Sequence, residues 1–554
     1  MSVLQHIFKE EPGPAAGNGR LTLFYLLIIL LAGIKQVYGV QHYLDITFFD
    51  ETEYLYRGLL LPDKPYNDWS PAYNIWYYLL SFIQHNPVDL FYLNYIIIQS
   101  AVPLLLFIFL VRYKINPSLA LLLSLSYSLH PIVYSCFTLV GHFCLMIILT
   151  GFILLSLAKS DESKLIISLT TAYICIFIRV EFLIIFLAIA ALWCYFILLK
   201  RKFSLHIGYL IFAVIAVGIY VWFDGLSFKW KGMDRSYGAF MQYFYQNYVF
   251  WNKQSLTLDE FNNLKLFGNS KTMAECLFFN PGLFIKHVLT NMFSYLINIF
   301  KYFEDLLFPP PVFHYLGKIK HVLFFVTFVF LSFKTYKRFS LAGAVSLFRD
   351  NRITSLIAAI FFLWSFFSLF IVYPNKHYII IQFGWWILII ANILEPYTKW
   401  LNNRWILFSV SVIFLWLAPT AKSINYYHDG QKDIRTQPNL KTIQYLTKNN
   451  SGQPQVLFTS ESGFYAYLPT NYKEYFLEQE DVKPYITNGE IDILRFFNDK
   501  QIDVIYMNEK MQHLFEITLG ENGQTLLNEP EKMGFKKQII NPNLQAYLLY
   551  RIHE

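Results

Sequence analysis

Long apolar segments recur along almost the whole chain, and they constrain its fold more than any other feature. A helix that crosses a bilayer needs roughly 20 predominantly apolar residues. We count about eleven runs of this kind, some of them short, at about 21–40, 90–111, 117–134, 141–158, 164–179, 182–199, 205–223, 320–337, 353–373, 378–395 and 405–418. The sequence therefore predicts a polytopic α-helical membrane protein with a transmembrane domain over 21–418.

The composition agrees with lipid as the main solvent. The 554 residues are 55% hydrophobic and only 15% charged, whereas soluble domains carry about 25% charged residues. The net charge of +7 does not indicate nucleic-acid binding, because the basic residues flank apolar runs and form no single stripe. The five cysteines have neither metal-site nor disulfide-framework spacing. We expect the lipid bilayer as a partner and no nucleic acid.

The lysines and arginines predict the orientation. We take residues 1–20, a polar tail that ends in Arg20, as cytoplasmic. Every predicted inner loop is then basic, as the positive-inside rule requires; these loops contain Arg112 with Lys114, Lys159 with Lys164, Lys200 to Lys202, Lys334 with Lys337 and Arg338, Arg349 with Arg352, and Lys399 with Arg404. The segments 41–89, 224–319 and 419–554 fall outside. We expect a multi-pass protein of the cytoplasmic (inner) membrane.

The C-terminal tail differs in kind from the rest of the chain. Short β-like runs alternate in it with polar, helix-like stretches, which is typical of a small soluble α/β domain. The β-like runs are Gln455–Thr459, Ile502–Met507 and Ala546–Ile552, and the helix-like stretches include Pro438–Lys448 and Ile491–Asn498. We expect residues 419–554 to form an extracytoplasmic α/β domain.

Two adjacent carboxylates, Asp50 and Glu51, follow the first apolar run on the predicted outer side, with Tyr54 one turn later. The membrane surface partly desolvates a carboxylate and can raise its proton affinity, which suits a general base. The alternative is an ordinary solvated acidic loop with a helix N-cap.

Basic residues occupy two short turns on the same side. Arg179 and Glu181 form the turn between the fifth and sixth runs, and charges this close to hydrocarbon indicate function by default. An arginine there can bind a lipid phosphate through two hydrogen bonds, although a structural ion pair is an equal alternative. Lys376 and His377 lie in an outer turn and depart from the positive-inside pattern, unless this is merely a surface loop. His142 lies at the outer end of the fourth run, where a lone histidine is more often structural.

These residues could supply the two kinds of chemical group that one reaction needs. A polyprenyl phosphate is already a stable anion, so sugar transfer from it hardly requires a general acid. It requires a base for the acceptor hydroxyl and fixed cations on the phosphate. The carboxylates of the first outer segment and the cations of the later turns match this division.

The same motifs resemble the C-type glycosyltransferase superfamily (GT-C), which includes the protein O-mannosyltransferases of glycosyltransferase family 39 and the lipid A aminoarabinose transferases. The resemblance covers nearly the whole chain in order and topology, and each motif is short. It rests on Asp50-Glu51, the turn from Pro131 to Ser135, the arginine turn Phe177-Ile178-Arg179-Val180-Glu181, and Pro374-Asn375-Lys376-His377-Tyr378-Ile379. The C-terminal α/β tail is also similar to a domain found in many members.

The resemblance implies a membrane glycosyltransferase that moves a monosaccharide from a polyprenyl-phosphate donor to a hydroxyl or amine of a glycan, lipid or protein acceptor, with inversion. Asp50 would be the catalytic base, and Glu51 would position the acceptor or the base. Arg179, Lys376 and His377 would hold the donor phosphate, with Glu181, His142 and Tyr54 in support.

Two features depart from the superfamily pattern. Several members have a second acidic residue where this chain has Gly141-His142, so the sequence assigns no metal ligand and no cofactor, and metal dependence stays open. Lys376-His377 replaces the usual arginine.

Two other classes of function stay open. A transporter or lipid-linked sugar flippase would show charges in the middle of spans and a repeat between halves, whereas the charges here lie mainly at the ends of runs and no repeat is evident. A non-catalytic scaffold would leave Asp50, Arg179 and Lys376 far apart.

Overall fold

The computed structural model describes residues 19–48, 50–67, 70–134, 139–200, 207–223, 229–230, 233–253, 256, 258–310, 316–336, 352–397, 403–418, 420–421, 437–477, 482–487, 490–518, 520–540 and 546–552. Most of the predicted cytoplasmic tail and the basic residues Arg201 and Lys202 lie outside this part. The chain divides into two compact units. The helical unit comprises the chain up to Val37, Pro62–Ile75 and Ile96–Pro419, and the α/β unit comprises Tyr38–Leu61, Trp76–Tyr95 and the chain from Thr420 on.

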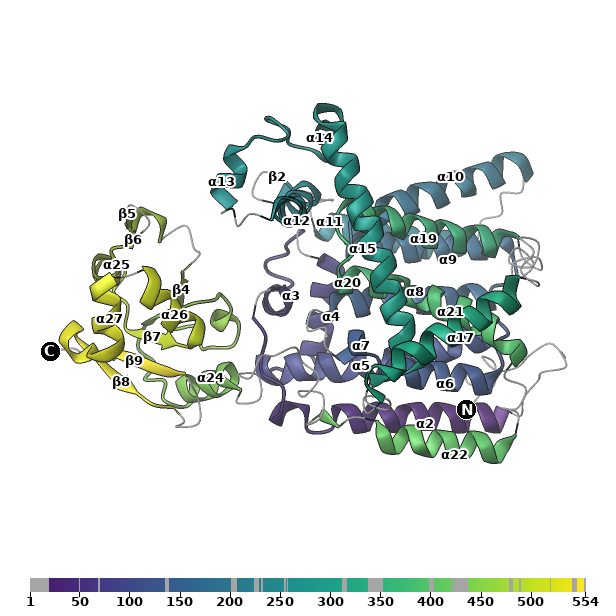
Figure 1. Ribbon diagram of the computed structural model, residues 1–554, viewed down its shortest axis with the longest axis horizontal. Helices are drawn as coiled ribbons and strands as arrows, with labels where there is room; N and C mark the ends of the chain where they lie inside the picture. The colour runs from purple at the N-terminus through teal and green to yellow at the C-terminus, as the bar shows by residue number, and fades with distance from the viewer. Residues whose placement is uncertain are drawn as a thin grey trace. The chain divides into compact units, whose positions relative to one another are not determined.

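The helical unit consists mainly of long apolar helices (Figure 1). Its helices are α2 (Gly19–Val37), α5 (Pro87–Arg112), α6 (Pro117–Ser128), α7 (Pro131–Tyr134), α8 (Val140–Leu157), α9 (Asp161–Ile176), α10 (Phe182–Lys200), α11 (Ile207–Trp222), α12 (Arg235–Asn252), α13 (Leu258–Asn263), α14 (Met273–Phe279), α15 (Pro281–Leu307), α17 (Ile319–Tyr336), α19 (Arg352–Ile371), α20 (Lys376–Ile379), α21 (Phe383–Leu394) and α22 (Arg404–Leu417), with a short hairpin of β1 (Lys229–Trp230) and β2 (Met233–Asp234). The first residues of α5 belong to the α/β unit.

The chain is a helical integral membrane protein. Within its described part, six segments are long and apolar enough to cross a bilayer, namely Leu21–His42, Pro87–Arg112, Val140–Leu157, Pro281–Leu307, Ile353–Ile371 and Ile380–Tyr397. Five shorter apolar helices are Pro117–Ser128, Phe182–Phe196, Ile207–Trp222, Ile319–Phe330 and Trp405–Trp416. The predicted run at 164–179 corresponds to α9, which belongs to neither set. The prediction of about eleven spans therefore stays a prediction.

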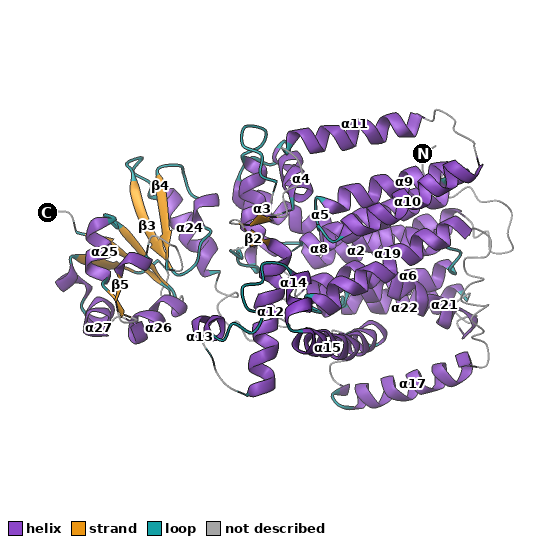
Figure 2. Cartoon of the chain, turned by 90° about the horizontal axis from the view of Figure 1, so that it is seen from above, coloured by secondary structure: helices purple, strands orange, loops and turns teal. Residues whose placement is uncertain are grey.

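Helix α15 lies inside the segment 224–319, which the sequence predicts to be outside the membrane. Its composition would allow it to span, but both of its ends contact one end of the helix bundle. The His287 ring bonds carbonyl oxygens at the end of α19, and the carbonyl of Tyr302 bonds His130, just beyond the end of α6. Figures 1 and 2 both show α15 crossing the direction of α6, α9 and α19. We infer that α15 lies across the bundle end.

The α/β unit contains a five-stranded mixed sheet in the order β4-β3-β7-β9-β8 (Figure 2). Strands β4, β3 and β7 are parallel, and β9 is antiparallel to both of its neighbours. The elements are α3 (Asp50–Leu59), the end of α4 (Pro71–Ser81), α24 (Pro438–Lys448), β3 (Gln455–Thr459), β4 (Tyr472–Phe476), β5 (Ile486–Thr487), β6 (Glu490–Ile491), α25 (Ile493–Asp499), β7 (Val504–Met507), α26 (Glu509–Thr518), α27 (Gly520–Asn528), β8 (Phe535–Gln538) and β9 (Tyr547–Arg551).

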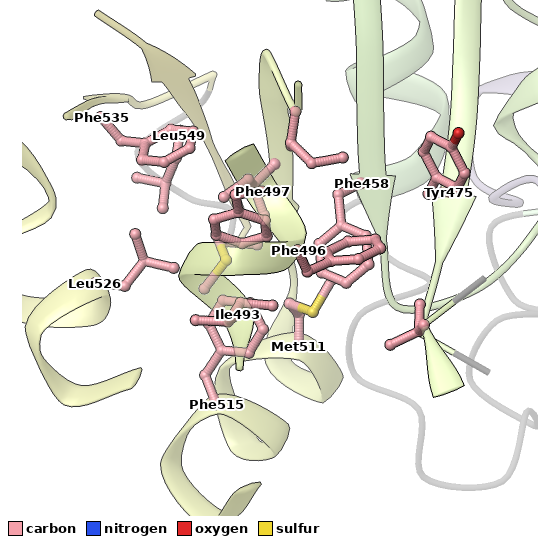
Figure 3. Packing of buried hydrophobic residues seen from close by; sticks show 14 of the residues in the cluster. Phe458, Tyr475, Ile493, Phe496, Phe497, Met511, Phe515, Leu526, Phe535 and Leu549 are labelled. Carbon is pink, nitrogen blue, oxygen red and sulfur yellow. The ribbon is translucent and has the colours of Figure 1, made fainter. Parts of the chain in front are cut away.

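Aromatic side chains fill the core between this sheet and its helices (Figure 3). Phe458 of β3 packs against Phe496 and Phe497 of α25, with ring centroids 5.2 and 5.7 Å apart. Met511 and Phe515 of α26 belong to the same buried cluster. The buried residues of β3 and the inner face of α25 therefore give the tail a core of its own.

The first predicted outer segment folds together with the C-terminal tail. Asp45 accepts hydrogen bonds from the backbone N–H groups of Asn439 and Leu440, at 3.0 and 2.8 Å, and so caps the N-terminus of α24. Gln437 donates to the carbonyl of Leu44 at 2.8 Å. Residues about 400 positions apart in sequence thus form one compact unit, and Asp50 and Glu51 belong to it.

Gly463 is required where the tail meets the first segment. Its φ is +153°, and a Cβ at this position would lie 2.4 Å from a ring atom of Phe48. We expect Gly463→Ala to destabilise the α/β unit by about 1–3 kcal/mol, seen as a lower thermal midpoint of the purified protein. Gly452→Ala is the matched control, since Gly452 has φ +75° and open space around it. Equal effects of the two substitutions would contradict the steric explanation.

Candidate functional site

The acidic pair opens α3, and the structure separates its two carboxylates. Glu51 is 2% exposed, and its Oε1 accepts hydrogen bonds from the Tyr77 hydroxyl at 2.5 Å and from Asn94 Nδ2 at 3.0 Å. Asn94 is in turn fixed by Trp76, whose indole N–H donates to Asn94 Oδ1 at 2.8 Å. Side chains of α4 and α5 thus hold Glu51 inside the α/β unit, so this carboxylate positions α3.

Asp50 has a different environment. It is the first residue of α3 and is only half-buried. Successive residues of a helix point about 100° apart, which explains why Glu51 turns inward while its neighbour stays accessible. The free N–H groups at a helix start favour a negative charge. Asp50 is therefore the more exposed carboxylate of the pair, and Tyr54, one turn later, is buried.

A loop of the C-terminal domain holds the outer side of α3. The Tyr465 hydroxyl donates to Glu53 Oε1 at 2.5 Å, and the other oxygen of Glu53 pairs with Arg57 at 2.9 Å. One residue before Glu53, Thr52 Oγ1 lies 3.2 Å from the hydroxyl of Tyr467. Burial and the Glu53 carboxylate both raise the pKa of Tyr465, which keeps this hydroxyl a donor. The helix that carries Asp50 is therefore oriented by residues more than 400 positions away.

Glu474 supports this loop and makes it sensitive to pH. It accepts hydrogen bonds from the backbone N–H groups of Gly463 and Tyr465 and from Thr459 Oγ1. Burial raises the pKa of Glu474 to about 7 from 4.5, so the folded state favours the protonated form. Its stabilising contribution is complete below pH about 4.5 and is lost as the pH rises through about 7.

We expect the thermal midpoint of the protein to decrease as the pH is raised from 5 to 8. The slope from one such group is at most about 1.4 kcal/mol per pH unit. Glu474→Gln should flatten the curve, whereas Glu531→Gln, at an exposed position, should leave it unchanged. Asp45, whose pKa burial also raises to about 7, should add to this dependence. Identical pH profiles of parent and Glu474→Gln would contradict this account.

The predicted arginine turn joins the late turn in the helical unit. The Arg179 guanidinium lies over the ring of Tyr378, 4.1 Å from its centroid. Ser70 Oγ donates to the carbonyl of Ile178 at 2.8 Å, and Ala72 N–H donates to that of Phe177 at 3.0 Å. Ser70 has a φ of +55°, a strained conformation that persists only where the surroundings impose it. The segment before α4 thus fixes the backbone that presents Arg179.

Lys376 and His377 begin α20, immediately before Tyr378. Their backbone is therefore next to the residue on which Arg179 stacks. Their side chains lie outside the described part of the structure. Glu181 is half-buried in the arginine turn, and His142 is buried in the first turn of α8.

A polar face of α15, which sequence reasoning missed, holds the chain before the late turn. His287 Nε2 lies 3.1 Å from the carbonyl of Ile371, and its Nδ1 lies 3.0 Å from Asn247 Nδ2. Asn291 donates to the carbonyl of Phe370 at 2.9 Å, and Tyr295 donates to Gln382 at 2.6 Å. The spacing of four between His287, Asn291 and Tyr295 places them on one helix face. This periodicity was the available signal.

The opposite face of α15 is apolar and exposed. Its residues are Ile285, Leu289, Met292, Phe293, Leu296, Ile297 and Phe300. An amphipathic helix with such an apolar face can lie in a membrane interface with that face toward the acyl chains.

The candidate residues thus form two groups. Asp50 and Glu51 start α3 in the α/β unit, and Arg179 lies with the turn of Lys376 and His377 in the helical unit. Across the described ranges, no cluster of three or more His, Cys, Asp or Glu residues is placed to bind a metal ion. Chemically, the first group offers a base and the second a cation. No family model matches the sequence, and no curated protein matches it.

Proposed function

We propose that the protein is a GT-C-type membrane glycosyltransferase that moves one monosaccharide from a polyprenyl-phosphate donor to an acceptor hydroxyl or amine. The observation that carries this proposal is the division of roles within the acidic pair. Glu51 is buried and fixed by Tyr77 and Asn94, while Asp50 beside it stays accessible at the helix start. A positioned, accessible carboxylate next to a structural one suits a general base.

In the proposed step, the acceptor oxygen attacks the anomeric carbon of the sugar from the face opposite the phosphate. The new C–O bond forms as the bond from carbon to phosphate oxygen breaks, and the configuration inverts. Asp50 takes the acceptor proton, and the electron pair leaves with the polyprenyl phosphate. Arg179, together with Lys376 and His377, binds the phosphate by charge-assisted hydrogen bonds. In this proposal, the reaction takes place on the extracytoplasmic face of the inner membrane.

The experiment that tests the proposal follows labelled sugar. The purified full chain is reconstituted in nanodiscs with a radiolabelled polyprenyl-phosphate monosaccharide and a detergent extract of envelope glycans. We expect label to move from lipid to the extract while free polyprenyl phosphate accumulates in equal amount. If proteoliposomes instead move labelled lipid or solute between leaflets without breaking the sugar–phosphate bond, the protein is a flippase or transporter and the proposal is wrong.

A further inference from the structure

Asn74 and His142 are among the buried polar side chains of the helical unit that have no hydrogen-bond partner within the described part of the chain. Asn74 of α4 is 1% exposed and His142 of α8 is 0% exposed. Neither the amide Nδ2 and Oδ1 of Asn74 nor the ring Nδ1 and Nε2 of His142 has a partner among the described residues. More than 90% of buried polar groups in native proteins are hydrogen-bonded, and each exception costs about 1–3 kcal/mol. These four unsatisfied atoms therefore indicate that a hydrogen-bonding molecule binds next to them.

The two side chains are on adjacent segments. Tyr73, the residue before Asn74, packs against Phe143, the residue after His142, with ring centroids 5.0 Å apart. Each of the four residues is buried. The start of α4 and the first turn of α8 thus meet through this aromatic pair.

The same corner contains the arginine turn. The residues just before Asn74 hold the backbone of residues 177 and 178 through the bonds from Ser70 and Ala72. That backbone leads directly to Arg179, which stacks on Tyr378. The partnerless atoms of Asn74 therefore belong to the segment that positions the proposed phosphate-binding arginine, and those of His142 belong to the helix turn that packs against this segment.

The chemistry of the four atoms indicates what could bind them. An asparagine amide offers two donors and an acceptor, and a neutral imidazole offers one donor and one acceptor. Such a set has no preference for an anion, which would require charged donors such as Arg179. Sugar hydroxyls both donate and accept, so their chemistry matches the polar groups of both side chains. A buried water molecule, which makes about three hydrogen bonds, is the other candidate.

We propose that Asn74 and His142 bind the hydroxyl groups of the donor sugar, next to the phosphate held by Arg179. This inference rests on the proposed function and assigns it a subsite. The two residues would select the glycosylated carrier over the bare polyprenyl phosphate. The apo protein leaves their polar atoms unsatisfied, a cost that the bound sugar removes.

The test compares carrier lipids with and without a sugar. Parent protein, Asn74→Leu and His142→Leu are purified as full chains in nanodiscs. Native mass spectrometry then measures the affinities of undecaprenyl phosphate and of its glucosyl, mannosyl and 4-amino-4-deoxyarabinosyl derivatives. We expect the parent to bind at least one glycosylated lipid about tenfold more tightly than the bare lipid, and each variant to lose this gain because its hydrogen bonds are removed. Affinity for undecaprenyl phosphate should not change.

Ser411→Ala is the matched control. Ser411 is also buried with a hydroxyl that lacks a partner among the described residues, but it lies on α22, which packs on α2 and α6. All three substitutions remove an unsatisfied group, so each should raise the thermal midpoint of the apo protein, and only those at Asn74 and His142 should change sugar binding. Should leucine prevent folding, Asn74→Ala and His142→Gln serve instead.

The outcomes separate this inference from the proposed function. Variants that keep the sugar-dependent gain would overturn the inference and indicate buried water only. If the parent binds undecaprenyl phosphate but binds none of the glycosylated lipids more tightly, the inference is also wrong. The protein would then still be one that binds polyprenyl phosphate. A parent that binds none of the lipids would overturn the proposed function itself.

Discussion

Replacing Asp50 by asparagine is expected to lower the turnover of sugar transfer by about 10²- to 10⁴-fold, the contribution typical of a positioned general base. Asp50 is the more exposed carboxylate at the start of α3, and in the proposed reaction it takes the proton of the acceptor hydroxyl. An amide of the same shape cannot take the proton. Donor binding through the phosphate should be unchanged, so kcat should fall while the donor KM does not. Initial rates with a labelled donor measure both.

Two further variants make the result specific to a base. Asp63→Asn removes an exposed aspartate from the turn that follows α3 and should keep full activity. Glu51→Gln leaves an oxygen that can still accept from Tyr77 and Asn94, so it should reduce activity less than Asp50→Asn. If Asp50→Asn inserts normally and keeps full activity, Asp50 is not the base.

Much of the C-terminal domain could be predicted from the sequence, because its central elements have strong periodicity. Strand β3 and helix α24 have the predicted bounds, and β7 and β9 lie within predicted runs. Strands β4 and β8 were not predicted. Both are edge strands with exposed charges, such as Lys473 in β4 and Lys536 and Lys537 in β8. Charges that protect an exposed edge also weaken the hydrophobic pattern.

Helix α15 was not predicted for a related reason. Hydropathy averages over a window, and His287, Asn291 and Tyr295 dilute the apolar signal of the opposite face. The bonds that these side chains make to residues 370–382 link positions that are about 80 residues apart. No local pattern contains such pairing, so only the folded chain reveals that α15 holds the late turn.

The residue types of the candidate site were predicted from the sequence, but which carboxylate is buried and which is exposed was not. Adjacent carboxylates have the same sequence signature whichever of them is buried. The choice of Glu51 is made by Tyr77 and Asn94, which reach it from two other helices. Likewise, the contact between Arg179 and Tyr378 joins two turns that the sequence could only place on one side of the membrane.

Arg179→Ala is expected to raise the donor KM by about 10- to 100-fold, because one charge-assisted interaction contributes about 1.5–3 kcal/mol. Arg179→Lys keeps the charge but loses both the planar fork and the stacking on Tyr378, so it should recover only part of the affinity. Tyr378→Phe retains the ring and should bind donor normally, whereas Tyr378→Leu should weaken it. Arg112→Ala is the control: Arg112 bonds Ser156 at 3.1 Å, and its loss should leave the donor KM unchanged. A donor KM that Arg179→Ala does not alter would remove Arg179 from the phosphate site, and the resemblance of its turn to the superfamily motif would then carry no function.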